Sequence, residues 1–244
     1  MLRAVAVVGF RKSGKTTVVE GLVRELAGRG YRVATIKHIR EKKFSIDVPG
    51  KDTWRHAQAG ARVVVSMAPQ EVATITKRGR IKPEEVMRTL QWLDFIIIEG
   101  FRKLKGVTKI ATSRTADEAA KLVDKFTIAC VGYGRWAVPV FSLNQMKELA
   151  DVVEKRTLPL LPGLNCGRCE YKSCEEFVLA VLAGQAELKD CLPMHDPVRL
   201  RVDGKVVPLN PFVQDLIAGA VKGMLSPLKG TKGRVIELVV MKHA

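Results

Sequence analysis

Residues 9–17 read GFRKSGKTT and fit G-x-x-x-x-G-K-[ST], the pattern of a phosphate-binding P-loop. In such a loop, backbone N–H groups surround a phosphate at the positive end of a helix. Lys15 would reach the β- and γ-phosphates, and the Thr16 hydroxyl would hold Mg²⁺. We therefore expect this loop to bind a nucleoside triphosphate. The expected contacts are Gly9, Arg11, Lys12, Ser13, Gly14, Lys15, Thr16 and Thr17.

The loop lies in the context that the pattern requires. Residues 4–8, AVAVV, form a short apolar run typical of a buried strand. Residues 18–26, VVEGLVREL, place apolar side chains at helical spacing. The alternative is a glycine-rich turn that arose by chance, but such a turn has no reason to connect a strand to a helix.

A P-loop enzyme also needs an acidic residue at the end of a neighbouring strand to hold Mg²⁺ or to position water. The apolar run at 95–98, FIII, ends at Glu99, and Gly100 after it allows close approach of another backbone. A carboxylate at the carboxyl end of a parallel strand faces the bound ligand. The alternative is that Glu99 only ends the strand in solvent.

The segment at 35–61 is dense in acidic and basic side chains and leaves the sheet on the ligand side. Asp47 or Asp52 could contact Mg²⁺ through water, although each residue of the segment, taken singly, is more often a surface residue. We keep Glu99 and Asp52 as candidate catalytic residues. The cations that could contact anionic oxygens are His38, Lys51 and Arg55.

Cysteines form the second chemical pattern, Cys166-x₂-Cys169-x₄-Cys174-x₁₆-Cys191. Four thiolates suit either tetrahedral Zn²⁺ or a [4Fe–4S] cluster. Structural zinc usually has two short Cys-x-x-Cys pairs. Here three cysteines share one loop, and the fourth follows a helix expected at 175–189. This asymmetry favours the cluster over zinc, and over an empty or disulfide state.

The other cysteine and a nearby histidine are expected to be structural. Cys130 lies inside an apolar run and is predicted to be a buried apolar residue. His195, just after the last clustered cysteine, is predicted to lie on the surface.

Composition narrows the class of protein and its partners. The formal net charge of +16 favours anionic partners, but the basic residues are spread along the chain. Only 6% of residues are aromatic, and no basic–aromatic motif is present, so nucleic acid is not favoured. No apolar run is long enough to span a membrane, and the apolar start is too short for a signal peptide. We expect a soluble, cytoplasmic protein.

The order of elements predicts an α/β fold of the P-loop NTPase type, with a mostly parallel sheet and helices on both faces. A small C-terminal iron–sulfur α+β module should follow. The strand candidates are 3–8, 32–36, 62–66, 71–75, 95–98, 108–112 and 126–131. The helix candidates are 15–29, 52–58, 83–92, 116–122 and 144–154, the last with Asn144 as its N-cap.

Two prolines and a glycine at 158–163, LPLLPG, mark a linker. We therefore expect a nucleotide-binding domain at 1–157, an iron–sulfur segment at 158–197 and a small α+β tail at 198–244 packed with it. The tail should contain a hairpin at 199–207 around an Asp-Gly turn, a helix capped by Asn210 and a strand at 234–240.

The motifs GFRKSGKTT, TIKH, FSIDVPGKDTWRHAQAGA and IIIEGF resemble MobB, the molybdopterin-guanine dinucleotide biosynthesis protein B family, over about residues 1–155. The resemblance implies a P-loop protein that binds GTP with Mg²⁺, hydrolyses it slowly at best and tends to form homodimers. It also implies a partner, the MobA guanylyltransferase that joins GMP to molybdopterin.

Two departures from related P-loop proteins concern the nucleotide. Arg11 and Lys12 stand where small residues are usual in MobB, which adds charge beside the phosphates. Phe10 stands where MinD-like loops carry an extra lysine, so a dimer-dependent ATPase switch is not supported. There is no N-K-x-D motif to read guanine, so a preference for GTP follows from the resemblance alone.

The stretch LPGLNCGRCEYKSCEEFVLAVLAGQAELKDCLP resembles the four-cysteine iron–sulfur domain of corrinoid iron–sulfur proteins and of RnfB electron-transport subunits. It departs from that domain at Glu170, where glycine is usual. Together the two resemblances imply an accessory GTP-binding protein of molybdenum or tungsten cofactor maturation that carries a [4Fe–4S] cluster. Such a protein would be at most a weak GTPase. The alternatives are a redox-regulated adaptor for a molybdo- or tungstoenzyme and an NTP-driven iron–sulfur carrier.

Overall fold

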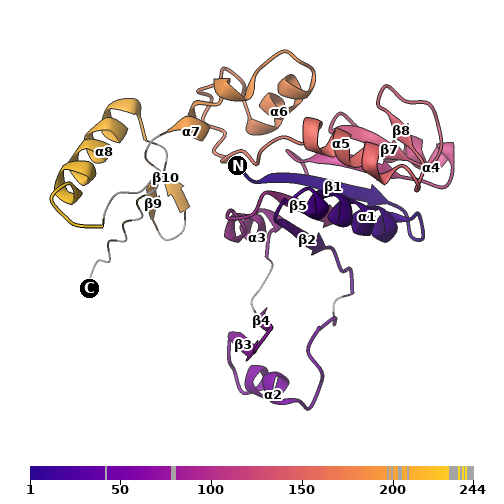
Figure 1. Ribbon diagram of the computed structural model, residues 1–244, viewed down its shortest axis with the longest axis horizontal. Coiled ribbons are helices and arrows are strands. Elements are labelled where there is room, and N and C mark those ends of the chain that lie inside the picture. Colours follow the sequence, from indigo (N-terminus) through magenta and orange to yellow (C-terminus); the bar gives the residue numbers. More distant parts are fainter. Residues whose placement is uncertain are drawn as a thin grey trace. The chain divides into compact units, whose positions relative to one another are not determined.

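A computed structural model describes residues 1–41, 43–77, 81–196, 198, 200–202, 205–207, 209–230, 236, 238 and 240. The chain divides into two compact units, Met1–Leu160 and Leu161–Ala244, which are described separately below (Figure 1). Among the described residues, no helix combines the length and the apolar character needed to cross a membrane.

The first unit is built on a six-stranded sheet in the order β2-β5-β1-β6-β7-β8. All five pairings between these strands are parallel. The strands are β1 (Arg3–Gly9), β2 (Val33–Lys37), β5 (Phe95–Glu99), β6 (Thr108–Thr112), β7 (Thr127–Val131) and β8 (Val140–Phe141). Strand β8, which is only two residues long, was not among the predicted strands.

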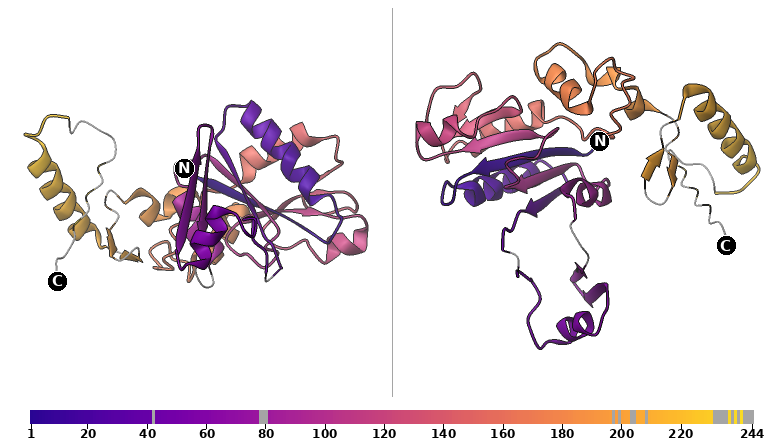
Figure 2. Two further views of the ribbon diagram at one scale, coloured as in Figure 1. Left: turned by 90° about the horizontal axis from the view of Figure 1, so that it is seen from below. Right: turned by 180° about the vertical axis from the view of Figure 1, so that it is seen from behind.

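Helices cover both faces of this sheet, which confirms the predicted P-loop NTPase-type α/β class (Figures 1 and 2). Residues 4–8 and 95–98 are fully buried because the central strands of a parallel sheet are covered on both sides. Met87 and Leu122 pack with Ala6 and Ile98 in one hydrophobic cluster. The helices of this unit's layers are α1 (Lys15–Gly28), α3 (Pro83–Thr89), α4 (Ala116–Ala120) and α5 (Met146–Arg156).

Helix α5 begins later than predicted. Gln145 is its N-cap residue, and no side chain caps it, so the assignment of Asn144 as N-cap is wrong. Asn144 instead accepts a hydrogen bond from Ser142 within the preceding turn. This short side-chain contact competes with capping, as Asn side chains in turns often do.

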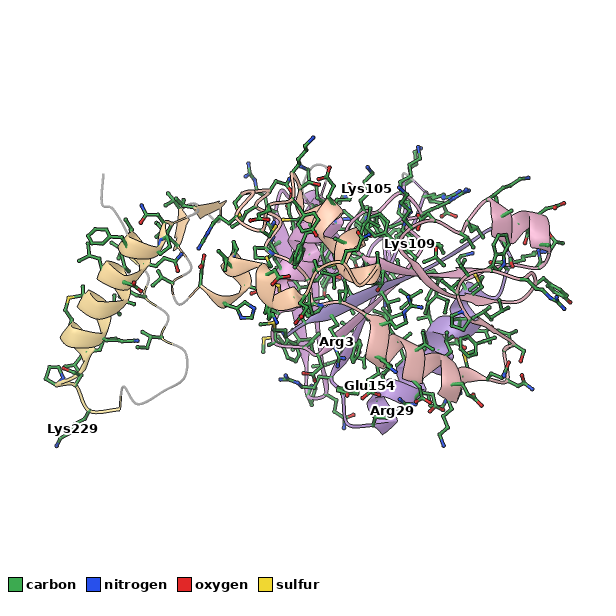
Figure 3. The ribbon with its side chains drawn as sticks, turned by 90° about the horizontal axis from the view of Figure 1, so that it is seen from above. Arg3, Arg29, Lys105, Lys109, Glu154 and Lys229 are labelled. Atoms are coloured by element: carbon green, nitrogen blue, oxygen red, sulfur yellow. The ribbon has the colours of Figure 1, made fainter. Side chains whose placement is uncertain are left out.

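An ionic cluster joins the end of the P-loop helix α1 to α5. Arg29 contacts Asp151 at 2.6 Å and Glu154 at 2.7 Å. Arg3 donates a 2.8 Å hydrogen bond to the backbone oxygen of Glu154, and the three labelled side chains Arg3, Arg29 and Glu154 lie near one another in Figure 3. These contacts fix the end of α1 against α5. They therefore help to hold the P-loop, which precedes α1.

A separate hairpin corrects one prediction. Strands β3 (Val63–Ala68) and β4 (Glu71–Thr76) pair antiparallel in a two-stranded sheet of their own, so they do not belong to the parallel sheet. Only Pro69 and Gln70 separate them, whereas a parallel connection needs a dozen or more residues. Helix α2 (Asp52–Gln58) packs against β3, and this excursion stands apart from the six-stranded sheet (Figure 1).

The second unit contains α6 (Cys174–Leu182), the 3₁₀ turn η1 (Leu188–Asp190), α7 (Leu192–His195), β9 (Leu200–Val202), β10 (Lys205–Val207) and α8 (Pro211–Leu225). The predicted helix at 175–189 is wrong beyond Leu182. Gly184, with φ +73°, ends it in a left-handed turn, and its N–H donates to the oxygen of Val181.

The tail agrees with the prediction where the structure describes it. Strands β9 and β10 pair antiparallel as a hairpin, and the Asn210 side chain caps α8 by accepting a 2.9 Å hydrogen bond from the N–H of Val213. The predicted Asp-Gly turn lies outside the described residues. So does most of the predicted strand at 234–240.

Candidate functional site

The P-loop connects β1 to α1 and is shaped by two glycines. A Cβ atom at Gly9 would lie 2.3 Å from both Ser13 Oγ and Thr112 Oγ1, so no larger residue fits there. Gly14 has φ +85° and is the N-cap residue of α1. Its left-handed backbone, which favours glycine, aims the first N–H groups of the helix into the loop.

The loop is tied to the neighbouring strand β6. Ser13 is buried, and its hydroxyl lies 2.8 Å from that of Thr112, the last residue of β6. Lys12 has φ +60°, an uncommon conformation for a residue other than glycine. Its side chain is exposed, as are those of Arg11 and Thr17. The positive charges of Arg11 and Lys12 therefore stay at the mouth of the loop.

Lys15 is half-buried, and its ammonium group donates to the backbone oxygen of Phe10 across the loop. Burial lowers the pKa of Lys15 because it removes water from the ammonium group, while the nearby Glu99 carboxylate acts in the opposite direction. The loop thus encloses a partly desolvated cation, and such a cation interacts strongly with an anion.

Glu99 ends β5 next to the start of α1. The Thr16 hydroxyl donates to Glu99 Oε1 at 3.2 Å, and the ammonium group of Lys37 lies 3.3 Å from the same oxygen. Next to it, the rings of His38 and Phe101 stack with centroids 4.2 Å apart. Thr16, Glu99 and Lys37 therefore meet at the carboxyl edge of the sheet, where ligands of such sheets bind.

The other acidic candidates belong to the excursion that carries α2. Asp52 begins α2, its side chain is 87% exposed, and its ion pair is with Arg55 of the same helix at 3.7 Å. Asp47 Oδ1 accepts from the N–H of Val48 and from the hydroxyl of Thr53. These contacts shape the local turn before α2, and the structure does not bring Asp52 or Asp47 to the P-loop.

All four clustered cysteines line one cavity of the second unit. Cys191 is buried, Cys166 is exposed, and Cys169 and Cys174 are intermediate. Burial raises the pKa of the Cys191 thiol to about 11. The remaining lining includes Pro162, Leu164, Tyr171, Phe177 and Pro193, so the cavity wall is mainly apolar.

The cysteine loop is held by its own polar contacts. Asn165 Oδ1 accepts a 2.8 Å hydrogen bond from the N–H of Cys174, the first residue of α6. Arg168 pairs with Asp196 at 2.8 Å. Glu170 has φ +67°, which explains why glycine is usual at this position in the domains that the segment resembles.

The four cysteines share this cavity but are not gathered into a ready-made site for one metal ion. Among the residues that the structure describes, no group of three or more His, Cys, Asp or Glu side chains is placed to hold a single metal ion. His195 is exposed, as predicted. Cys130 is fully buried in β7, also as predicted, and burial raises its pKa to about 11.

Sequence reasoning missed three residues of these sites. The place of Lys37 in the site depends on the register of β2 beside β5, which pairs Lys37 with Glu99. The place of Thr112 depends on the pairing of β6 with β1, which puts Thr112 opposite Gly9. Asn165 gave no signal beyond its position before the first cysteine. All three depend on contacts between distant or folded segments.

The P-loop between β1 and α1, with Glu99 on the adjacent strand, defines the first unit as a P-loop nucleotide-binding fold. A family model described as molybdopterin guanine dinucleotide synthesis protein B matches residues 4–132, and a model for an Fe–S cluster matches residues 161–193. The chain belongs to the MobB family and carries an additional iron–sulfur type segment.

Relatives support this assignment over different lengths. A protein of Methanocaldococcus jannaschii, described as a molybdopterin-guanine dinucleotide biosynthesis adapter, is 32% identical over 94% of this chain and 93% of its own. The adapter protein of Escherichia coli is 30% identical over 63% of this chain and 92% of its own. For the fold alone, the crystal structure of Bacillus subtilis MobB matches with a TM-score of 0.55 at 24% identity, over 64% of this chain and 98% of that one.

Proposed function

We propose that this protein is a GTP-binding adapter in molybdopterin-guanine dinucleotide biosynthesis and that its second unit carries a [4Fe–4S] cluster. The observation that carries the proposal is the meeting of the P-loop residue Thr16 with Glu99 at the carboxyl edge of the sheet. The adapter role is the one that relatives' names give, including the M. jannaschii protein that matches both units.

The nucleotide site accounts for each residue at the loop. Backbone N–H groups from Gly9 to Thr17 bind the phosphates, and Lys15 leaves the Phe10 oxygen to contact the β- and γ-phosphates. Thr16 and Glu99 would hold Mg²⁺, directly or through water. Glu99 would also position the water of a slow hydrolysis. We retain Asp52 as a candidate only for a state in which the excursion with α2 moves toward the loop.

The spacing of the four cysteines suits a cluster better than a single zinc ion. Structural zinc usually has two short Cys-x-x-Cys pairs, whereas here three cysteines precede or begin α6 and the fourth, Cys191, follows it. Four thiolates are the ligand set of a cubane cluster. Cys166, Cys169, Cys174 and Cys191 would hold it, and the apolar wall would limit water around it. Such a cluster supplies one-electron chemistry or structural stability.

The exposed face of the β3–β4 hairpin suits a homodimer. Val63, Val65, Met67 and Val72 share one face, because alternate residues of a strand point the same way and Met67 pairs with Val72. Each of these side chains is more than half exposed. We propose that a second copy of the chain covers this face. A MobA-type guanylyltransferase is the client that the family's role implies, with a molybdo- or tungstoenzyme as the alternative.

The test uses anaerobically purified full-length protein. GTP and ATP are titrated in the presence of Mg²⁺, iron, sulfide and zinc are quantified, and the guanylyl transfer of a cognate transferase is measured with and without the protein. Micromolar or tighter GTP binding, four irons per chain and faster transfer are the expected results. Absence of nucleotide binding, or stoichiometric zinc without iron, contradicts the corresponding half of the proposal.

A further inference from the structure

The strands on the two sides of β1 indicate the direction in which a nucleotide would lie across the site. Glu99 lies on β5, on one side of β1, while β6 and β7 lie on the other side. Thr16 and Glu99 would hold the Mg²⁺ that accompanies the β- and γ-phosphates, so they would mark the γ-phosphate end. The nucleoside would then extend away from them, toward the ends of β6 and β7.

The chain ends on that side touch one another in succession. Ser13 of the P-loop contacts Thr112 at the end of β6. The next residue, Ser113, lies so close to Gly132 after β7 that a Cβ there would be 2.0 Å from the Ser113 oxygen. Neighbouring strands are about 4.8 Å apart, so β7 lies roughly 10 Å from β1. A nucleoside attached to phosphates in the loop can span that distance.

Tyr133 occupies this position at the end of β7. Its side chain is 62% exposed, and it lies between Gly132 and Gly134, which have φ +118° and +107°. The indole N–H of Trp136 donates a 3.3 Å hydrogen bond to the backbone oxygen of Tyr133. The same indole fills the place that a Cβ at Gly134 would take. The backbone is therefore held while the aromatic side chain stays accessible.

An apolar side chain from the segment after β8 lies against the P-loop. Leu143 follows β8, is half-exposed, and has Cδ2 3.8 Å from the position that a Cβ at Gly14 would take. Tyr133 and Leu143 offer apolar surface on the β6–β8 side, although the Arg114–Glu118 ion pair also lies after β6. A flat purine base, attached to phosphates in the loop, matches such an apolar surface.

We propose that Tyr133 stacks on the purine base of the bound nucleotide and that Leu143 contacts the nucleoside beside Gly14. The inference rests on the proposed nucleotide site and names its base-binding side. Stacking acts on the π-face that every purine has, so Tyr133 contributes affinity for the base rather than a choice between guanine and adenine.

The test compares GTP, GDP and inorganic tripolyphosphate binding to wild type, Tyr133→Ala and Tyr133→Phe, by calorimetry of the full chain with Mg²⁺. Trp92→Ala, which removes an aromatic side chain of similar exposure after α3, is the matched control. Tyr133→Ala should weaken GTP and GDP by about 10- to 100-fold and leave tripolyphosphate unchanged. Tyr133→Phe and Trp92→Ala should bind all three as wild type does.

Equal GTP affinity of Tyr133→Ala and wild type overturns the inference, as does an equal loss for GTP and tripolyphosphate, since that loss would be a phosphate or folding effect. A thermal melt of each variant identifies the latter. If wild type binds neither GTP nor tripolyphosphate, the nucleotide site itself is wrong. Leu143→Ala should weaken GTP in the same direction as Tyr133→Ala, again with tripolyphosphate unchanged, and an unchanged GTP affinity overturns the assignment of Leu143.

Discussion

The side-chain hydroxyl of Thr16 donates a 3.2 Å hydrogen bond to Oε1 of Glu99, a residue 83 positions away. The same carboxylate oxygen also lies 3.3 Å from the ammonium group of Lys37. The two candidate Mg²⁺ ligands thus contact each other, with a lysine that balances the carboxylate charge. A divalent cation would take over the role of that lysine.

Lys15→Ala should weaken GTP binding by roughly 10- to 150-fold and leave the first unit folded. The ammonium group contributes a charge-assisted contact worth roughly 1.5–3 kcal/mol, and the lost contact leaves phosphate oxygens without a partner. Titration with labelled GTP, together with a thermal melt, measures both effects. Arg11→Ala is the control, because its exposed side chain should change affinity by less. Identical affinity of Lys15→Ala and wild type would remove the P-loop assignment.

Glu99→Gln should keep GTP affinity within about tenfold, or ~1.4 kcal/mol, while it lowers Mg²⁺-dependent hydrolysis. Glutamine keeps the hydrogen bond from Thr16 but loses the charge that Mg²⁺ and Lys37 share. Phosphate release at saturating Mg²⁺ measures this effect, with Asp52→Asn alongside. A wild-type rate for Glu99→Gln would leave Glu99 as an ordinary strand end, and a large loss for Asp52→Asn would place the excursion with α2 in the reaction.

Any single Cys→Ser change at Cys166, Cys169, Cys174 or Cys191 should bleach the cluster or make it labile. Cys130→Ala is the matched control, because Cys130 is buried in β7 of the other unit. Visible absorption and EPR spectra of anaerobic samples measure the outcome. An unchanged spectrum in any one of the four serine variants would contradict ligation by that cysteine.

Removal of the metal should destabilise the second unit and leave the stability of the first unit unchanged. A metal-dependent module gains much of its folding free energy from ligation. Chelation should therefore expose the chain after about residue 158 to protease and leave a nucleotide-binding fragment. An apo sample that resists protease throughout its length would contradict this expectation.

Asp124→Asn should destabilise the first unit more than Lys109→Met does. The Lys109 ammonium group lies 2.6 Å from Asp124 Oδ2, but its side chain is 4% exposed and that of Asp124 is 41% exposed (Lys109 is labelled in Figure 3). Loss of the carboxylate leaves a buried charge without its ion pair, at about 2–4 kcal/mol, whereas water can solvate Asp124 after Lys109 is replaced. Urea unfolding measures the difference, and the reverse order would contradict it.

The ion pair of Asp94 with Arg32 predicts that the free energy of unfolding falls at acid pH. Hydrogen bonds from Arg32 lower the pKa of Asp94 to about 2, from an ordinary value of 3.8. A carboxyl whose pKa is lower in the folded state stabilises the protein above pH 4, and this stabilisation is lost as the pH falls toward 2. Asp94→Asn should therefore show a smaller drop in stability between pH 4 and pH 2, measured by urea unfolding. Equal drops would exclude this pair as the cause.

The sequence predicted what depends on local pattern. The P-loop, the apolar strands and the cap at Asn210 each follow from residues close together in the chain. The prediction failed where a few residues decide topology. Pro69 and Gln70 turn two apolar runs into a hairpin, and Gly184 ends α6 early. The pairing of Glu99 with Lys37 depends on strand register, which one sequence does not reveal.

The distribution of thiols gives the protein a built-in chemical label. Cys130 is inaccessible and stays protonated near neutral pH, with a pKa of about 11, while the other four cysteines all belong to the second unit. A thiol-reactive fluorophore added to metal-free protein will therefore mark the four cysteines of the second unit while Cys130 stays unlabelled. Slow modification of Cys130 in the same sample then serves as a clock for opening of the nucleotide-binding sheet.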